Sequence, residues 1–97
     1  MRHFHRTHIP AEQVLAIADT FFPSLALAKT AAQPRSRSYS GALGTMTLRV
    51  RSEGGHYTFI EAETDQVGES RLDRNVKRFF VRVHRAAEPS HAIAAAY

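Results

Sequence analysis

The arginines near the C-terminal end of the sequence follow a spacing that could do binding chemistry. Five of them recur at intervals of three or four positions: Arg71, Arg74, Arg78, Arg82 and Arg85. This spacing places them on one face of an α-helix, where guanidinium groups are suited to phosphates or another acidic surface. We favour the more ordinary interpretation, that they form the solvated face of a docked helix, since such faces usually carry charge.

The charge of this stripe is poorly compensated by the residues around it. Like charges three and four positions apart on a helix repel one another, and only Asp73 and Glu88 lie close enough in sequence to relieve them. This repulsion suggests acids supplied by another molecule, for which the run Glu61, Glu63 and Asp65 of a second copy fits as well as a nucleic acid. No helix-turn-helix signal, aromatic-glycine RNA motif or zinc-finger spacing accompanies the stripe, so nucleic-acid binding is an alternative that we do not favour.

Two other groups of residues could bind a metal or transfer protons. His3 and His5 point the same way on a strand, but a Zn²⁺ or Ni²⁺ site needs a third ligand, and no acid lies nearby in the sequence. Glu61 and Glu63 share one strand face, where two carboxylates could shift each other's pKa. Structural ion pairs are the better interpretation, because Arg49 is expected opposite. We predict no metal, no cofactor and no catalytic residue, and we do not favour an enzyme.

Length and composition limit what these residues can belong to. The chain has 97 residues, a formal net charge of +4, a hydrophobic fraction of 43% and no cysteine. This composition is typical of one globular domain with a modest core, and it excludes disulfides and thiolate chemistry. No segment has the roughly 18–20 apolar residues of a membrane span, and the N-terminus lacks the apolar run of a secretory signal. We expect a cytoplasmic protein without membrane contact, with one domain over residues 1–88 and a flexible or loosely docked tail over 89–97.

The first third of the chain predicts a strand followed by an interrupted helix. Residues 2–9 alternate as in a strand, and Pro10 suits the first position of a helix. The apolar spacing that follows predicts a helix that breaks at Pro23, because the residue before a proline avoids helical geometry. The stretch 24–34 is ambiguous: its alanines favour a helix, and the alternation of its leucines favours a strand. We favour a short helix that begins at Pro23.

The middle of the chain carries the clearest β signal. A short strand over residues 36–40 is followed by two segments, 45–52 and 57–64, in which apolar and polar residues alternate. Two glycines between these segments predict a hairpin turn. A two-residue loop would place acids on the apolar face, so we predict the three-residue loop 54–56.

This loop length fixes the register of the hairpin. It sets Val50 opposite Ile60 and places Arg49 opposite Glu61 as a cross-strand ion pair. The face away from the apolar side is then partly aromatic and partly charged. Its members are Arg49, Arg51, Tyr57, Phe59, Glu61 and Glu63.

The last predicted element is a long helix with one apolar face. Either Asp65 or Ser70 caps it, since Ser70 with Asp73 three residues later resembles a capping box, and it ends near Ala87. The apolar side chains lie on the side away from the arginines: Leu72, Val76, Phe79, Phe80, Val83 and Ala87. About 18 helical residues extend about 27 Å, so we expect this face to lie across the apolar side of the hairpin.

Two stretches, HIPAEQV at residues 8–14 and GESRLDRNVKRFF at residues 68–80, resemble the entry into the first helix and the terminal helix of the helix-grip family. This family includes the START and polyketide-cyclase-like domains. The resemblance implies a long helix that closes a curved sheet over a cavity for lipids, polyketides or other apolar molecules. The cavity-facing residues would be Leu72, Val76, Phe79 and Val83. Members of the family are longer and have six or seven strands, so either a homodimer completes the cavity or the likeness is one of topology only.

Together these patterns predict an α+β domain: an antiparallel sheet of about four strands, with an interrupted N-terminal helix and a long C-terminal helix packed on one face. The first functional hypothesis is a homo-oligomeric, dimeric binding or assembly module for an apolar small ligand. Arg49, Tyr57 and Phe59 would form the contact surface between copies. The alternative is binding of a polyanion or nucleic acid through the arginine stripe.

Overall fold

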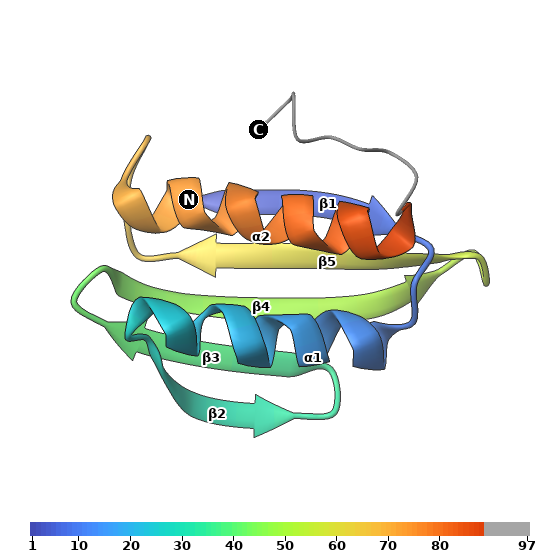
Figure 1. The fold of residues 1–97 in the computed structure, drawn as a ribbon, viewed down its shortest axis with the longest axis horizontal. Helices are drawn as coiled ribbons and strands as arrows, with labels where there is room; N and C mark the ends of the chain where they lie inside the picture. The colour runs from blue at the N-terminus through green and yellow to red at the C-terminus, as the bar shows by residue number, and fades with distance from the viewer. Residues whose placement is uncertain (89–97) are drawn as a thin grey trace.

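The computed structural model describes residues 1–88 and has the predicted α+β class (Figure 1). Within these residues there are five strands, two α-helices and one short 3₁₀ turn. In order they are β1 (Arg2–Thr7), α1 (Ala11–Phe21), η1 (Pro23–Leu25), β2 (Ala28–Gln33), β3 (Ser36–Gly41), β4 (Gly44–Glu53), β5 (Tyr57–Thr64) and α2 (Arg71–Ala87). The tail predicted over 89–97 lies outside the described residues.

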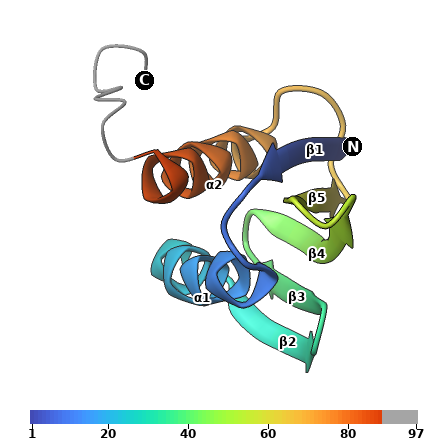
Figure 2. The same ribbon diagram turned by 90° about the vertical axis from the view of Figure 1, so that its right-hand side faces the viewer.

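The strands form one antiparallel sheet in the order β1-β5-β4-β3-β2, with β1 and β2 at its edges. Both α-helices pack on the same face of this sheet, α2 over β1 and β5 and α1 over β4 and β3 (Figure 2). The two helices run side by side in opposite directions (Figure 1). No described helix covers the other face, which we call the open face.

The hairpin register is the one that the sequence predicts. Val50 pairs with Ile60 and Arg49 pairs with Glu61, and residues 54–56 form the loop. Gly54 and Gly55 have φ values of 65° and 76°, a left-handed conformation that glycine adopts without strain. The apolar side of β4 and β5 therefore faces the helices, and the charged and aromatic side forms part of the open face.

The prediction for residues after Pro23 is wrong in part. The proline does end the first helix, but only the 3₁₀ turn Pro23–Leu25 follows it, and 28–33 form strand β2 instead of continuing a helix. Ala26, with a φ of 61°, redirects the chain. Helix propensity is a weak preference, and pairing with β3 overrides the alanines here. This strand makes the sheet one strand wider than expected.

The start of α1 also differs slightly from the prediction. Strand β1 ends at Thr7 and not at residue 9. Pro10 is extended and occupies the N-cap, so the helix begins one residue later, at Ala11. The start of α2 is as predicted, because Ser70 caps it and its Oγ accepts a hydrogen bond from the Asp73 N–H at 3.0 Å.

The core lies between the helices and the sheet. The ring of Phe22 meets those of Tyr39 and Phe79, with centroids 5.1 and 5.2 Å apart. The four apolar side chains predicted to face a cavity have no exposed surface and belong to this core: Leu72, Val76, Phe79 and Val83. Within residues 1–88, no helix is long and apolar enough to cross a membrane.

Candidate functional site

The four residues predicted to bind an apolar ligand face packed side chains. Phe79, the largest of them, is enclosed by Phe21 and Phe22 of the α1 end as well as by the sheet. None of the four lines any of the surface hollows described below. A ligand between α2 and the sheet would therefore have to displace core contacts.

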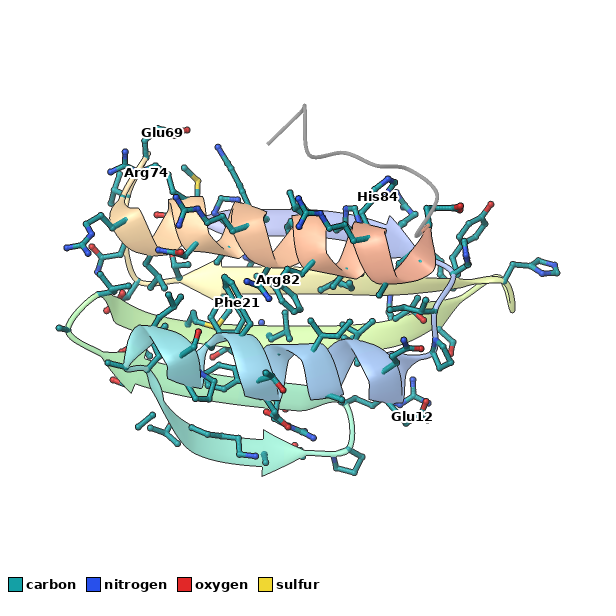
Figure 3. All side chains as sticks on the ribbon, viewed as in Figure 1. Glu12, Phe21, Glu69, Arg74, Arg82 and His84 are labelled. Carbon is teal, nitrogen blue, oxygen red and sulfur yellow. The ribbon has the colours of Figure 1, made fainter. Side chains whose placement is uncertain are left out.

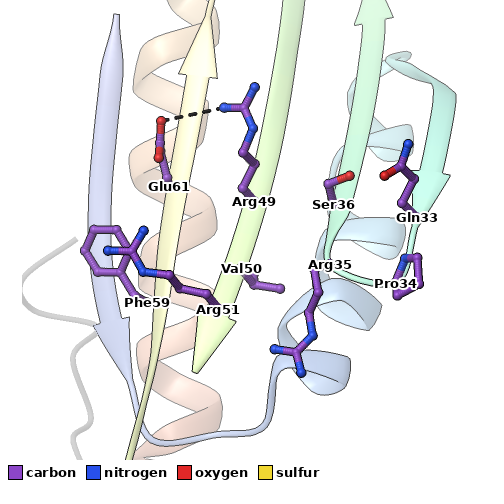
Figure 4. Close-up of a pocket in the computed structure, with 9 residues that line it drawn as sticks. All are labelled: Gln33, Pro34, Arg35, Ser36, Arg49, Val50, Arg51, Phe59 and Glu61. Carbon is purple, nitrogen blue, oxygen red and sulfur yellow. Dashed lines mark ion pairs between the residues drawn. The ribbon is translucent and has the colours of Figure 1, made fainter. Parts of the chain in front are cut away.

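The open face carries the residues predicted to contact a second copy. Arg49 lies 3.6 Å from Glu61 and 3.1 Å from Glu63, so the predicted ion pair forms and extends to a second acid (Figure 4). Arg2 approaches the same two carboxylates from β1, at 3.8 Å from each. The hydrogen bond from Arg49 and the charge of Arg2 hold the pKa of the Glu63 carboxyl below its usual value. The charges along this part of the face are therefore matched within one molecule.

The aromatic side chains of the open face are covered to different degrees, and Phe4 is 55% exposed. Phe59 is only 9% exposed, because the guanidinium carbons of Arg51 and Arg6 lie 4.4 and 5.1 Å from its ring centroid and Phe4 stacks on it at 5.6 Å. Tyr57 remains 54% exposed. Of the three predicted interface residues, Tyr57 alone presents a large free apolar surface.

A shallow hollow of about 600 Å³ crosses the open face between the β2–β3 turn and β4 (Figure 4). Arg49 points towards Glu61, Arg51 points towards Phe59, and Arg35 points away from both. The charged side chains around this hollow thus diverge. Among the arginines that line it, only Arg35 lacks a carboxylate partner within the described chain. This arrangement does not converge on a ligand.

The arginines of α2 differ from those of the sheet. All five are exposed, and within residues 1–88 none of them forms an ion pair with a carboxylate. By contrast Arg2, Arg6, Arg37, Arg49 and Arg51 each have an acidic partner. Lys77 of α2, by contrast, lies 3.0 Å from Glu69. Within residues 1–88, the arginines that lack a carboxylate partner are therefore concentrated on α2.

Three of these arginines, Arg78, Arg82 and Arg85, border a groove between α1 and α2. Two adjoining hollows of about 530 Å³ each lie along it, and both are lined by Phe21, Arg82 and Arg85. The guanidinium carbon of Arg82 lies 5.1 Å from the Phe21 ring centroid, so this cation sits over the apolar floor (Figure 3). The apolar lining comes from both helices and the 3₁₀ turn: Ala16, Ile17, Phe21, Leu25, Val81 and Ala86.

The sequence indicated only part of this groove. The arginine stripe and the broad apolar face of α1 were both visible, and Ile17 lies at the margin of that face. The two helices are separated by about fifty residues in the chain, however, so their contact depends on the sheet that carries them.

A second polar cluster, of which the sequence predicted only the Ser70–Asp73 pair, surrounds Asp73. This carboxylate is buried and accepts hydrogen bonds from Thr64 Oγ1 at 2.9 Å and from Ser70 Oγ at 2.5 Å, and it lies 2.7 Å from His3 Nε2. Burial alone would raise the pKa of Asp73, but the hydrogen bonds from Ser70, His3 and Thr64 outweigh it and hold the pKa below the ordinary value of 3.8. The cluster ties β1 and β5 to the start of α2, and its buried carboxylate is closed to a substrate.

His3 and His5, the two histidines on one side of β1, have different partners. His3 contacts Asp73, whereas His5 stacks on Phe80 with ring centroids 5.1 Å apart. Burial and the nearby His84 lower the pKa of His5. Among the described residues no three His, Cys, Asp or Glu side chains gather in a way that could hold a metal ion.

A scan of protein-family models and a search of curated proteins each returned no match to this chain. The function must therefore be argued from the groove and the charges that border it.

Proposed function

We propose that this protein is a binding module for an anionic ligand, which it holds at the arginine face of α2 beside the groove. The observation that carries this proposal is the contrast in charge pairing: the arginines of the sheet have carboxylate partners and those of α2 have none within the described chain. Unrelieved like charges at helical spacing destabilise a helix. A bound anion removes that repulsion, so it stabilises the folded protein while it binds.

The groove also modifies the first expectation from the sequence. An apolar ligand enclosed between α2 and the sheet, as the helix-grip resemblance implies, has no room beside Phe79 and its neighbours. We therefore place the ligand on the outer side of α2, where apolar surface and free guanidinium groups meet.

The test uses pyrophosphate as the anionic probe, with binding followed by calorimetry. The variant Arg82→Gln removes one guanidinium group from the groove, and we expect it to weaken binding by about tenfold or more, because a hydrogen bond to a charged group contributes about 1.5–3 kcal/mol. Arg49→Gln is the matched control, since Arg49 already has acidic partners. Equal losses in both variants would show that net charge alone, and not this site, governs binding.

A second candidate function is assembly through self-association. The observation that favours it is the edge strand β2, in which all six residues are exposed. Its one charged side chain, Lys29, lies 3.6 Å from Asp19 of α1 and is thereby neutralised. Every other residue of an edge strand directs its backbone N–H and C=O outwards, ready to pair with another strand. We propose this edge as the contact between two copies. We prefer it to the open face, whose charges are mostly paired within one molecule.

A further inference from the structure

We infer that the ligand of the α1–α2 groove is a single amphipathic anion: an alkyl chain that lies on the groove floor and ends in a phosphate or carboxylate head held by the arginines. This inference rests on the proposed anion-binding function and adds the chemical class of the ligand. It places the chain along α1 and the head beside Arg78, Arg82 and Arg85.

The floor of the groove is suited to an alkyl chain. Ile17 and Leu25 are half-buried side chains that pack against the core on one side and line the two hollows on the other. Phe21 joins the hollows, because it lines both. Apolar surface left in contact with water is stabilised when a chain covers it. Inorganic phosphate or a short polyanion would leave this surface wet.

The rim of the groove is suited to an anionic head. The guanidinium carbon of Arg82 lies 5.1 Å from the Phe21 ring centroid, so its charge lies at the edge of the groove while the side chain stays exposed. Arg85 lines both hollows and Arg78 lines the one beside Leu25. A guanidinium group can donate two parallel hydrogen bonds to a phosphate or carboxylate. Three such groups along one groove provide donors for the anionic end of a chain.

The dimensions favour one small molecule over a long polyanion. Each hollow has a volume of about 530 Å³, which lies within the range of about 300–1,000 Å³ common for small-molecule sites. A nucleic acid on the convex face of α2 could reach Arg71 and Arg74 as well, but it would not enter the groove. Binding of a nucleic acid would therefore make no use of the contact between Arg82 and Phe21.

The inference is tested with alkyl phosphates from butyl to dodecyl, each used below its critical micelle concentration, with pyrophosphate as the head-group reference. We expect affinity to rise with chain length, by up to about fourfold for each methylene that enters the groove. Decyltrimethylammonium, which has a similar chain and the opposite charge, should not bind. Calorimetry on the full chain gives the dissociation constants.

Two variants of the floor separate the chain from the head. Ile17→Ser and Leu25→Ser remove apolar surface at different hollows without altering any charge, and thermal unfolding checks that each remains folded. We expect both to flatten the dependence on chain length while pyrophosphate binds as before. Arg82→Gln should weaken every ligand of the series.

The outcomes distinguish the inference from the function on which it rests. If pyrophosphate binds at α2 but longer chains bind no better, the amphipathic ligand is excluded and the anion-binding function stands; tighter binding of a single-stranded oligonucleotide would then identify a polyanion. If neither pyrophosphate nor any alkyl phosphate binds, both proposals fail. Sedimentation with phosphatidylglycerol vesicles that persists in Ile17→Ser would assign the arginines to a membrane surface and would overturn the inference of a single bound molecule.

Discussion

Asp73 is the residue on which the start of α2 depends most. Its carboxylate is 1% exposed and lies within hydrogen-bonding distance of three side chains from three different parts of the chain: His3, Thr64 and Ser70. A buried carboxylate is tolerated only when its oxygens are satisfied in this way. Each partner therefore matters to the docking of α2 as well as to its cap.

We predict that Asp73→Asn lowers the free energy of unfolding by about 1–3 kcal/mol, because the amide can no longer accept hydrogen bonds with both terminal atoms and leaves a buried polar group unsatisfied. Urea unfolding measures the change. Glu12→Gln is the control, since Glu12 is an exposed acid in the first turn of the other helix. An Asp73→Asn protein as stable as the control would contradict the assigned role.

The low pKa of Asp73 predicts how this stabilisation varies with pH. Because the folded-state pKa is below the ordinary value of 3.8, the unfolded chain takes up the proton first as the pH falls. The contribution is therefore present above pH 3.8 and is lost as the pH falls through the folded-state pKa. We expect the difference in unfolding free energy between the native protein and Asp73→Asn to narrow below that pH. A difference that stays constant in acid would show that folding does not lower the pKa of Asp73.

The sequence predicted part of this cluster for a clear reason. Ser70 and Asp73 are three residues apart, so their reciprocal cap is a local pattern and was recognised. His3 and Thr64 reach the same carboxylate only after β1 has paired with β5 and both have packed under α2. The spacing of residues along the sequence does not predict these long-range contacts with Asp73.

At the scale of elements, α2 combines a well-packed apolar face with a face of unrelieved positive charge. The arginines at positions 74, 78 and 82 lie four residues apart and repel one another. Such a face is less stable than one of mixed charge, which is consistent with a surface kept for binding.

We predict that Arg78→Glu makes the protein more stable and less able to bind anions. The new carboxylate lies four residues from both Arg74 and Arg82, so two repulsive pairs become attractive, a gain of about 1 kcal/mol in unfolding free energy. Pyrophosphate binding should fall in the same variant. Chemical unfolding and calorimetry measure the two effects.

The control for this prediction is Arg49→Glu on β4. It places a third acid beside Glu61 and Glu63 and removes their partner, so the protein should lose about 1 kcal/mol of stability. If Arg78→Glu were destabilising to a similar degree, Arg78 would have a structural partner, and the uncompensated charge of α2 would be an incorrect description.

The strands show where sequence patterns are informative and where they are not. The β4–β5 register followed from alternation and one loop length, because a shift by one residue would have turned acids into the core. Strand β2 was missed because its residues, Ala28–Gln33, are all exposed. A strand that buries neither face has no alternation to recognise, and only its pairing with β3 defines it.

At the scale of the whole molecule, the two faces and the edges of the sheet differ in how many of their charged, apolar and backbone groups have partners within residues 1–88. The open face pairs most of its charges internally but leaves Phe4 and Tyr57 more than half exposed. The helix face leaves the arginines and the groove free, and the β2 edge leaves backbone groups free. The first hypothesis from the sequence assigned self-association to the open face, and the binding and assembly proposals instead use the helix face and the β2 edge.

We predict that β2 pairs with β2 of a second copy about a two-fold axis near Ala31, which joins the two sheets. The chain has no cysteine, so single cysteines report the contact directly. Opposite residues in an antiparallel pair have Cβ atoms about 4.5–5.5 Å apart, and Ala31→Cys should therefore form an intermolecular disulfide under mild oxidation. Light scattering should show a mass that rises with concentration from the 10.9 kDa of one chain towards twice that value.

Tyr57→Cys is the control for the open face. If Tyr57→Cys cross-links and Ala31→Cys does not, the interface lies on the open face. If the protein remains monomeric at high concentration, assembly is excluded altogether. Either result leaves the groove proposal unaffected, because the groove lies on the other side of the sheet.

The measurement that tests the central claim most directly is a pyrophosphate titration of ¹⁵N-labelled protein, followed through the backbone amides and the arginine Nε–H signals. The account predicts that shifts concentrate on Arg78, Arg82 and Arg85 and on the groove residues of α1, while the Nε–H signals of Arg49 and Arg51 stay in place. Shifts centred on the sheet arginines, or spread evenly over all of them, would contradict the claim that α2 carries the binding surface.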